Sequence, residues 1–448
     1  MTESSRKPRV LLVAATTGYQ TQAFADAAAR EGIEIDLATD RCHILDDPWG
    51  DHAHALRFED AEGSAGVLAR SRDLQGGVGW DGVIAAGDRP AYVAAVAAAR
   101  LGIPFHPPEA VAACGNKFLS RERFRAAGLA VPEYFSLPLE TDPATAAAQA
   151  VFPCVLKPLG LSGSRGVIRA NDTTEFIDAF ERIRALLHLP EIRRVHRPED
   201  RFIQVERFIP GREFALEGIV TAGNLRVLAL FDKPDPLDGP FFEETIYITP
   251  SRTPEPVQRA IEETTARAVH ALGLWHGPIH AEMRVNDAGV WMLEVAARPI
   301  GGLCARVLPG LEELILRHAA GRPLGGIRLK DRAAGVMMVP IPAAGIYSGV
   351  AGVEDAAAPS LGEPTGLGAS PKRFQGTTLV DWLHAKDSRS RTLSVSMKDR
   401  GAILPVGRSV ADVYWYFPDG RFTTSNYYRA SLPDWVNAFN ARKMPQSF

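Results

Sequence analysis

Residues 153–167 read PCVLKPLGLSGSRGV and form the most informative stretch of the sequence. An apolar run ends at Lys157, and the next ten residues contain three glycines and two serines. Backbone amides in such a loop can turn inward around phosphate oxygens, while the lysine ammonium adds a positive charge beside them. The stretch therefore predicts a strand that leads into a phosphate-binding loop, with a hairpin tip and a solvated lysine as the alternative. It is not a Walker A loop, because the lysine precedes the glycines and no helix follows directly.

A second stretch, GPIHAEMRVNDAGVWMLEVAARPIGG at 277–302, alternates apolar and polar residues as the two strands of a hairpin do. A three-residue loop at 287–289 would set Asn286 opposite Val290, and the same register places Glu282 directly opposite Glu294. Directly opposed carboxylates lie roughly 5 Å apart and repel each other unless a cation neutralises them. Hard oxygen ligands in small number suit Mg²⁺ better than zinc. These two glutamates are therefore candidate magnesium ligands.

Two other interpretations of this hairpin stay open. The true register can differ by one residue from the one assumed. Alternatively, Arg284 and Arg298 can simply pair with the glutamates on a solvated face.

A third segment, QVERFIPGREF at 204–214, joins an apolar strand to a turn at Pro210-Gly211 and then to a second strand. An extended connector of this kind can offer its main-chain amide and carbonyl to an adenine edge. Glu213 could accept both ribose hydroxyls. In isolation the segment indicates only a hairpin.

The first part of the chain alternates short apolar runs with helical stretches, which indicates a parallel sheet with crossover helices. The predicted strands are 9–15, 33–38 and 82–86, and the predicted helices are 20–31 and 90–101. No GxGxxG motif follows the first strand, so a nicotinamide dehydrogenase has little support. The pattern changes at Asn116, which places the first domain boundary near residue 113.

The composition is that of an ordinary globular protein, with 448 residues of which 46% are hydrophobic and 23% charged. This length predicts about three compact units. The formal net charge of -3 provides no basic field for a nucleic acid backbone, so no nucleic acid partner is expected.

Four cysteines lie far apart without a CxxC pair, which predicts neither a zinc site nor a disulfide framework and fits the cytoplasm. The uncharged run at 333–353 is long enough to cross a bilayer, but Pro340 and Pro342 interrupt it. We therefore expect strands and turns there, and no membrane partner.

Taken together and in this order, these segments resemble the ATP-grasp superfamily, and within it the carboxylate-amine ligases that include bacterial L-amino acid ligases. The resemblance runs from the first strand to roughly residue 410. It implies an α/β (α+β) fold with an N-terminal Rossmann-like parallel-sheet domain, a small glycine-loop lid domain and a larger antiparallel-sheet domain. The corresponding divisions are 1–113, 114–204 and 205–330, followed by a C-terminal subdomain at 331–448.

The resemblance also implies nucleotide-binding roles. CGNKFLSRERFRAAGLAVP at 114–132 is similar to a helix whose lysine, here Lys117, contacts ATP phosphate, and Lys157 matches a second such lysine. VERFIPGREF at 205–214 looks like the nucleotide hinge. The residues implied to bind the nucleotide are Lys117, Lys157, Gly160, Ser162, Gly163, Ser164, Gly166, Glu206, Arg207, Phe208, Ile209 and Glu213.

Glu282 and Glu294 match two magnesium-binding glutamates of the superfamily, which implies ATP with one or two Mg²⁺ ions and Mn²⁺ as a substitute. Arg298 matches an arginine beside the reacting carboxylate, and Lys233 is similar to a lysine near the transferred phosphate. Many members have asparagine two residues after the second glutamate, whereas this sequence has Ala296. Alanine cannot coordinate a metal, so the number of ions stays open.

The resemblance implies that ATP converts a carboxylate into an acyl phosphate, which an amine then attacks to give an amide, ADP and phosphate. Both reactants are expected to be small molecules, with amino acids favoured. Two alternatives stay open: an enzyme that activates bicarbonate or formate, and a nucleotide-binding subunit without turnover. A homodimer is one alternative for the oligomeric state.

Substrate-binding residues are less clear from the sequence. Glu244, in FFEETIYIT at 241–249, could pair with a substrate ammonium, or it could lie on a solvated strand edge. Gly301 and Gly302 could leave space for a bulky side chain or allow a tight turn. His280 could assist deprotonation of the amine, but a hydrogen-bonded support is the favoured interpretation. Asp88 could border the substrate cleft, although capping of the helix at 90–101 explains it adequately.

Overall fold

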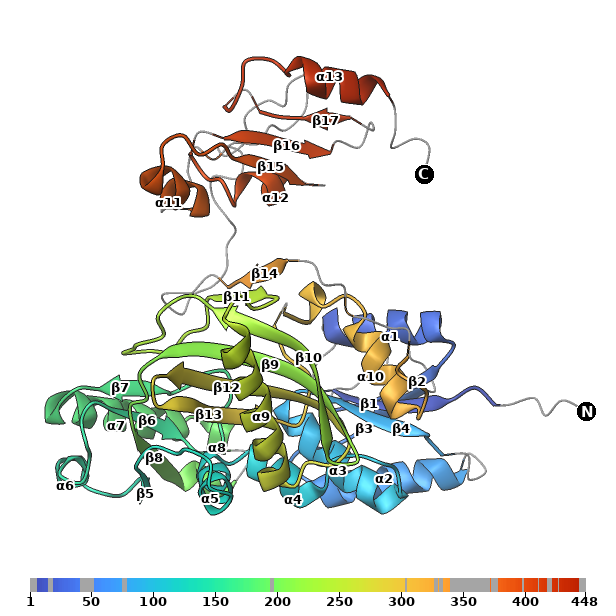
Figure 1. Ribbon diagram of the computed structural model, residues 1–448. Coiled ribbons are helices and arrows are strands. Elements are labelled where there is room, and N and C mark those ends of the chain that lie inside the picture. Colours follow the sequence, from blue (N-terminus) through green and yellow to red (C-terminus); the bar gives the residue numbers. More distant parts are fainter. Residues whose placement is uncertain are drawn as a thin grey trace, which may run out of the picture. The chain divides into compact units, whose positions relative to one another are not determined.

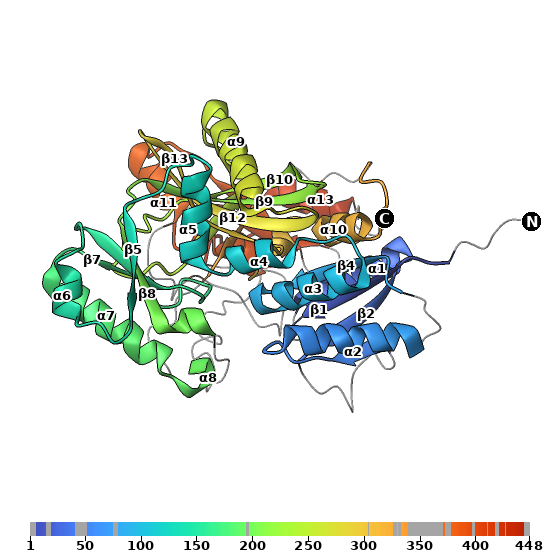
Figure 2. The ribbon, with the colours of Figure 1, turned by 90° about the horizontal axis from the view of Figure 1, so that it is seen from below.

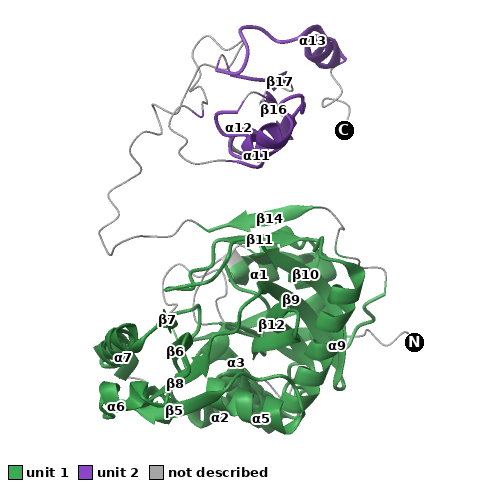
Figure 3. Cartoon of the chain, turned by 60° about the vertical axis from the view of Figure 1, so that its left-hand side comes forward, with its two compact units in different colours: residues 1–341 green, residues 342–448 purple. Residues whose placement is uncertain are grey.

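The computed structural model covers the whole chain (Figure 1). It describes residues 6–14, 19–40, 52–74, 79–193, 197–302, 304–325, 329, 333–338, 371, 378–396, 399–409, 411–416, 421–425 and 427–442. The chain divides into two compact units, residues 1–341 and residues 342–448 (Figure 3).

The N-terminal part of unit 1 is a four-stranded parallel sheet in the order β3-β2-β1-β4. Its strands are β1 (Arg9–Ala14), β2 (Glu34–Thr39), β3 (Ala53–Ala55) and β4 (Gly82–Ala86). The helices that alternate with them are α1 (Tyr19–Glu31), α2 (Ala61–Leu74) and α3 (Asp88–Leu101). The predicted Rossmann-like alternation is confirmed, and α2 and α3 lie side by side against the sheet (Figure 2).

The alternation of β1 explains this layering. Leu11 and Val13 pack in one cluster with residues of α2 and α3, whereas Val10 and Leu12 pack with Phe24 of α1. Successive side chains of a strand point to opposite faces, so an entirely apolar strand must be covered on both sides.

Two short helices, α4 (Pro108–Cys114) and α5 (Lys117–Ala126), lead into the second sheet. The Asn116 side chain caps α5 by accepting hydrogen bonds from the backbone amides of Phe118 and Leu119. The cap fixes the first residue of α5, which is Lys117.

The second sheet is antiparallel and has the order β5-β8-β6-β7. Its strands are β5 (Tyr134–Pro138), β6 (Cys154–Pro158), β7 (Ile168–Ala170) and β8 (Phe202–Arg207). The accompanying helices are α6 (Pro143–Ala147), α7 (Thr173–Leu187) and α8 (Pro190–Arg193), and a 3₁₀ turn spans Pro198–Arg201. The glycine loop at 160–166 connects β6 to β7, so this sheet carries it.

The third sheet has six strands in the order β13-β12-β9-β10-β11-β14. They are β9 (Arg212–Thr221), β10 (Asn224–Lys233), β11 (Ile246–Thr249), β12 (Gly277–Asn286), β13 (Gly289–Ala296) and β14 (Ala334–Met337). Helix α9 (Glu255–Leu272) packs on β10 and β13, and a 3₁₀ turn (Cys304–Val307) precedes α10 (Leu311–Ala319). β14 pairs with β11, so the structure keeps it in unit 1, whereas the sequence division placed residues from 331 on in the C-terminal segment.

The β12–β13 hairpin corrects one sequence expectation and confirms another. Asn286 pairs with Gly289, so the loop has two residues, and the predicted pairing of Asn286 with Val290 is wrong. A bulge next to Glu282 skips Leu293 and restores the pairing of Glu282 with Glu294. The predicted opposition of the two glutamates therefore holds, although the predicted turn does not.

Unit 2 has a three-stranded sheet in the order β15-β16-β17. Its elements are α11 (Leu379–Lys386), β15 (Leu393–Ser396), α12 (Asp399–Ile403), β16 (Asp412–Tyr416), β17 (Phe422–Thr423) and α13 (Asp434–Ala441). A small core forms around Val413 and Trp415 of β16.

Within the described part of the chain, no helix is both long enough and apolar enough to span a bilayer. Of the uncharged run at 333–353, residues 334–337 form β14. The positions from 339 to 353 lie outside the described residues.

Candidate nucleotide-binding and catalytic site

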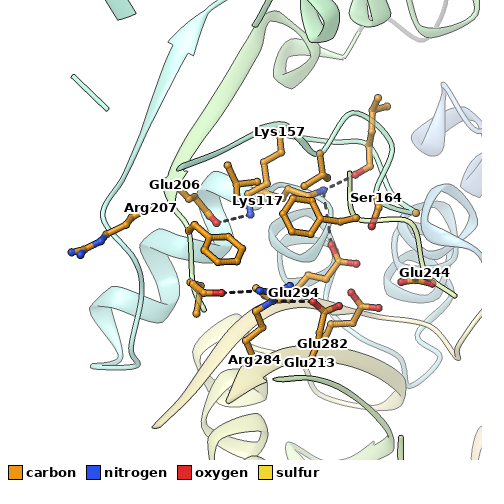
Figure 4. Close-up of a pocket in the computed structure, with 18 residues that line it drawn as sticks. Lys117, Lys157, Ser164, Glu206, Arg207, Glu213, Glu244, Glu282, Arg284 and Glu294 are labelled. Atoms are coloured by element: carbon orange, nitrogen blue, oxygen red, sulfur yellow. Dashed lines mark hydrogen bonds and ion pairs between the residues drawn. The ribbon is translucent and has the colours of Figure 1, made fainter. Parts of the chain in front are cut away.

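A narrow cavity of about 100 Å³ lies between the second and third sheets of unit 1 (Figure 4). Many of the residues predicted from the sequence line it together: Lys117, Lys157, Gly163, Ser164, Glu206, Arg207, Phe208, Ile209, Glu213, Glu244, Glu282 and Glu294. Ligand pockets commonly measure roughly 300–1,000 Å³. A nucleotide would therefore need the glycine-loop domain to move away from the third sheet.

Lys157, at the end of β6, belongs to a buried cluster of charges. Its Nζ lies 2.5 Å from Oε2 of Glu206, and Nε of Arg121 lies 2.7 Å from Oε1 of the same carboxylate. Burial lowers the pKa of Lys157 to about 8, against the opposing effect of Glu206. Burial alone would raise the pKa of Glu206, but the charges of Arg121 and Lys157 outweigh it and lower the pKa to about 2.

Arg121 is fully buried and was missed by sequence reasoning. It lies one helical turn after Lys117 on α5, inside the segment 114–132 that was singled out. Its other contact, to the carbonyl oxygen of Leu293 on β13, joins segments far apart in the sequence. Only the i, i+4 spacing from Lys117 could have drawn attention to it.

Lys117 connects the glycine loop to the third sheet. Its Nζ donates to the carbonyl oxygen of Leu161 at 2.5 Å and lies 3.9 Å from Oε2 of Glu294. A phosphate placed between the loop and β13 would therefore meet this ammonium.

The glycine loop contains backbone conformations that require or favour glycine. Gly163 and Gly166 have φ of 65° and 78°, and Ser164 has φ of 52°. A Cβ added to Gly166 would lie 2.8 Å from Leu186 Cδ2, so the Leu186 side chain would have to shift. The left-handed turns orient successive amides as a phosphate-binding loop needs.

Lys233 lies among three carboxylates. Its Nζ is 2.7 Å from Glu213, 3.3 Å from Glu282 and 3.4 Å from Glu244. Burial lowers the pKa of Lys233, but the surrounding negative charges outweigh it and raise the pKa above the usual value. The ammonium is therefore held charged beside a candidate metal ligand.

Glu213 occupies a different environment from the one predicted for a ribose ligand. One oxygen bonds Lys233, and the other accepts from Nε of Arg284 at 3.1 Å. Arg284 also donates to the carbonyl oxygens of Ile209 and Leu237, so it braces the predicted hinge. Arg284 therefore pairs with Glu213, and not with Glu282 or Glu294 as the alternative interpretation of the hairpin assumed.

His280 is hydrogen-bonded on both sides, as expected for a support. Its Nδ1 lies 2.6 Å from Glu217 and its Nε2 lies 3.4 Å from Glu282. Burial lowers the pKa of His280, but the two carboxylates outweigh it and raise the pKa to about 9.

Burial raises the pKa of Glu244 to about 7, and the charge of Glu282 adds to this.

Arg298 is bound by Asp88 from the N-terminal domain. Its Nε and Nη2 donate to the Asp88 carboxylate at 2.7 and 3.1 Å. The cap of α3 is Gly87 and no side chain caps it, so the helix-cap interpretation of Asp88 is wrong. Asp88 also receives a hydrogen bond from Ser162, which links Arg298 to the glycine loop.

Three other predicted residues are more peripheral. The guanidinium of Arg207 points away from the cavity (Figure 4) and lies 3.8 Å from Glu133. Gly301 has nothing within 4 Å of an added Cβ, and at Gly302 the nearest atom is in Met338, 3.5 Å away. Gly301 is therefore open enough for a side chain, whereas the φ of 59° at Gly302 favours glycine, as in a tight turn.

The donor set fits magnesium. Glu282 and Glu294 face each other across β12 and β13, and Mg²⁺ commonly takes one or two carboxylates together with phosphate oxygens and water. Among the described residues, no ready-made group of three or more metal-ligating side chains occurs. Ala296 pairs with His280 and contributes no oxygen. Phosphate oxygens and water would have to complete the coordination.

The chain is similar to several known proteins. The profile of the ATP-grasp domain family matches residues 150–307. A crystal structure of L-amino acid ligase from Bacillus licheniformis has a TM-score of 0.62 and 27% identity, covering 75% of this chain and 82% of that chain. Alanine–anticapsin ligase of Bacillus subtilis (strain 168) is 28% identical over 220 residues, 46% of each protein.

An alkaline phosphatase, PhoV of Synechococcus elongatus, is 43% identical over 99 residues, which are 21% of this chain and 18% of that protein. This chain therefore spans less than half the length of either curated relative. The predicted α/β fold class and the resemblance to ATP-grasp ligases are confirmed.

Proposed function

Because this chain carries an ATP-grasp domain, we propose that it is an ATP-dependent carboxylate–amine ligase that forms an amide bond through an acyl phosphate. The products are the amide, ADP and inorganic phosphate. The two substrates are two amino acids, or an amino acid and another amine. ATP and Mg²⁺ serve the reaction, with Mn²⁺ as a substitute, and the cytoplasm supplies them.

The observation that carries the proposal is the convergence of opposite charges on one cavity. Lys117 and Lys157 reach it from the glycine-loop side, and Glu282 and Glu294 reach it from the third sheet. A triphosphate needs cations around its oxygens, and Glu282 and Glu294 offer the carboxylate oxygens that Mg²⁺ prefers. A magnesium nucleotide would match both groups.

In the first step, a substrate carboxylate oxygen attacks the γ-phosphorus and the bond to the bridging oxygen breaks, releasing ADP. Bound magnesium would neutralise charge on the triphosphate and on the departing oxygen. Lys117, Lys157 and the loop amides would hold the phosphates in line with the attacking oxygen. Closure of the loop would keep water from the acyl phosphate.

In the second step, an uncharged amine attacks the acyl carbon, the bond to the phosphate oxygen breaks, and the amine proton leaves with phosphate or water. Arg298 would stabilise the oxyanion. Its contacts to Asp88 and to the carbonyl oxygen of Pro299 use three N–H donors, and a guanidinium has more than three. Glu244, beside Lys233, would bind the ammonium of the amino acid that is activated.

The test is ATP-dependent product formation with purified full-length protein. Each of the common amino acids is supplied with ATP, Mg²⁺ and hydroxylamine, which traps an acyl phosphate as a hydroxamate. Mixed amino acids then replace hydroxylamine, and the products are identified by mass spectrometry. ADP release with bicarbonate or formate alone would favour a carboxylase-type enzyme. No stimulated ADP release with any carboxylate would favour a non-catalytic nucleotide-binding subunit.

A further inference from the structure

A second cavity of about 590 Å³ lies on the other side of the glycine loop, between the N-terminal domain and the glycine-loop domain. One wall comes from the first turns of α2 and α3 and from the α4–α5 segment. The other comes from residues 160–165 and 197–199. Leu161 lines both cavities, so the loop separates them.

The second cavity reaches Asp88, which binds the proposed catalytic arginine, Arg298. Asp88 lines the cavity and holds Arg298 at 2.7 Å. Ser162, which hydrogen-bonds Asp88, lines it as well. A molecule in the cavity would therefore approach the acyl group from the side opposite the nucleotide.

One wall is apolar and partly aromatic. Phe58, Tyr92, Val111 and Leu119 line it. Tyr92 and Leu119 are 42% and 44% exposed, although large apolar side chains are usually buried. Apolar walls of this kind favour a ligand with a large apolar body.

Two arginines on the cavity walls have only loose ion pairs. Arg89 lies 4.0 Å from Glu59 and rests over the ring of Phe58 at 5.8 Å. Glu59 is held more closely by Arg57, at 3.1 Å. Arg165, on the glycine loop, lies 3.8 Å from Glu191. Exposed pairs at such distances contribute little stability, so both guanidiniums can turn to a ligand.

Arg197, the third arginine of the cavity, has close hydrogen-bond partners within the protein. It donates to both oxygens of Asp200 at 3.2 and 3.0 Å and to the carbonyl oxygen of Gly160 at 3.1 Å. It therefore supports the loop, and the anion-binding capacity of the cavity comes from Arg89 and Arg165.

We propose that the second cavity binds the amine substrate, and that this substrate is an amino acid or short peptide with an aromatic or large apolar side chain and a free carboxylate. Arg89 and Arg165 bind the carboxylate, and Phe58 and Tyr92 contact the apolar body. The amine then lies toward Asp88 and Arg298. The inference rests on the proposed ligase function.

The test compares three amines with the full-length protein, ATP, Mg²⁺ and a carboxylate that gives a hydroxamate. Phenylalanine has both features, 2-phenylethylamine lacks the carboxylate, and alanine lacks the ring. We expect kcat/KM for phenylalanine to exceed that for 2-phenylethylamine at least about tenfold, because hydrogen bonds to a charged carboxylate are worth about that much. It should also exceed kcat/KM for alanine, because alanine has no ring to bury against Phe58 and Tyr92.

The variants Arg89→Ala and Arg165→Ala should each reduce the preference for phenylalanine over 2-phenylethylamine about tenfold, through KM. Tyr92→Ala should reduce the preference for phenylalanine over alanine. Arg100→Ala, at the other end of α3, is the matched control and should change neither ratio. These shifts require binding in the cavity and would not follow from a general loss of stability.

Two outcomes overturn the inference in distinguishable ways. If hydroxamate forms but phenylalanine and 2-phenylethylamine react equally well, in native protein and variants alike, the cavity does not select the amine and the ligase function stands. If no carboxylate gives a hydroxamate, the proposed function fails and the inference falls with it.

Discussion

The two cavities that flank the glycine loop contain the same kinds of charged side chains but hold them differently. In the nucleotide cavity, Lys157 and Glu206 are buried and lie 2.5 Å apart. In the second cavity, Arg89 and Glu59 are 44% and 39% exposed and lie 4.0 Å apart. Burial commits a charge to its partner, because an unpaired charge cannot stay inside the protein, whereas an exposed charge can exchange its partner for water or a ligand.

This difference in burial predicts which mutations should have large effects and which should have small ones. Loss of one member of a buried, closely spaced pair should strongly lower the stability of the protein. Loss of one member of a loose surface pair should hardly change the stability and should mainly weaken ligand binding.

The largest expected effect is that of Glu294→Gln, which removes a proposed magnesium ligand from the third sheet. The change keeps the side-chain volume, so the fold should persist while turnover falls by more than about a hundredfold. ADP release measures turnover, and circular dichroism measures whether the fold persists. Glu263→Gln, exposed on α9, is the control, and normal turnover in Glu294→Gln would reject the magnesium assignment.

The next effect is that of Lys157→Met, which removes a proposed phosphate-binding charge and leaves Glu206 with Arg121 and Gln204. We expect ADP to bind about 10- to 100-fold more weakly, since hydrogen bonds to charged groups have this magnitude. Isothermal titration calorimetry measures the change, with the exposed Lys7→Met as control. An unchanged affinity for ADP would mean that the loop is structural.

A smaller effect is expected for Asp88→Asn, which keeps the shape of the side chain but removes the charge that holds Arg298. The guanidinium would lose its fixed position, so kcat should fall about tenfold while the affinity for ADP stays the same. Steady-state kinetics measures kcat, and calorimetry measures the affinity for ADP. Asp81→Asn, at the opposite end of β4, is the control, because Asp81 pairs with the exposed Arg6. Equal losses of kcat and ADP affinity would point to a general structural role for Asp88.

The sequence predicted the parts of the nucleotide cavity that depend on local pattern. Lys157 follows from a strand that ends at a glycine loop, and the pairing of Glu282 with Glu294 follows from alternation along two strands. The alternation could not reveal the bulge beside Leu293, because a bulge leaves the composition of both strands unchanged. The predicted loop is one residue longer than the real loop, and this extra residue offsets the bulge that was not predicted. The predicted pairing of Glu282 with Glu294 is therefore correct.

The parts that could not be predicted depend on contacts between distant segments. Arg121 meets Glu206 across 85 residues, and Arg298 meets Asp88 across 210. Nothing in either local sequence distinguishes these side chains from solvated ones. Asp88 was assigned to a helix cap because a residue just before a predicted helix usually has that role, and only the fold reveals its partner.

The smallest expected effect is that of Arg89→Ala on stability, which tests the difference between the two cavities directly. Arg89→Ala should change the free energy of unfolding by less than about 0.5 kcal/mol, because an exposed pair contributes little. Lys157→Met should cost about 2 kcal/mol or more, since Glu206 stays buried with one partner fewer. Urea unfolding of the full chain measures both. If the two variants were equally destabilised, Arg89 would be a structural residue, and of the two proposed carboxylate ligands in the second cavity only Arg165 would remain.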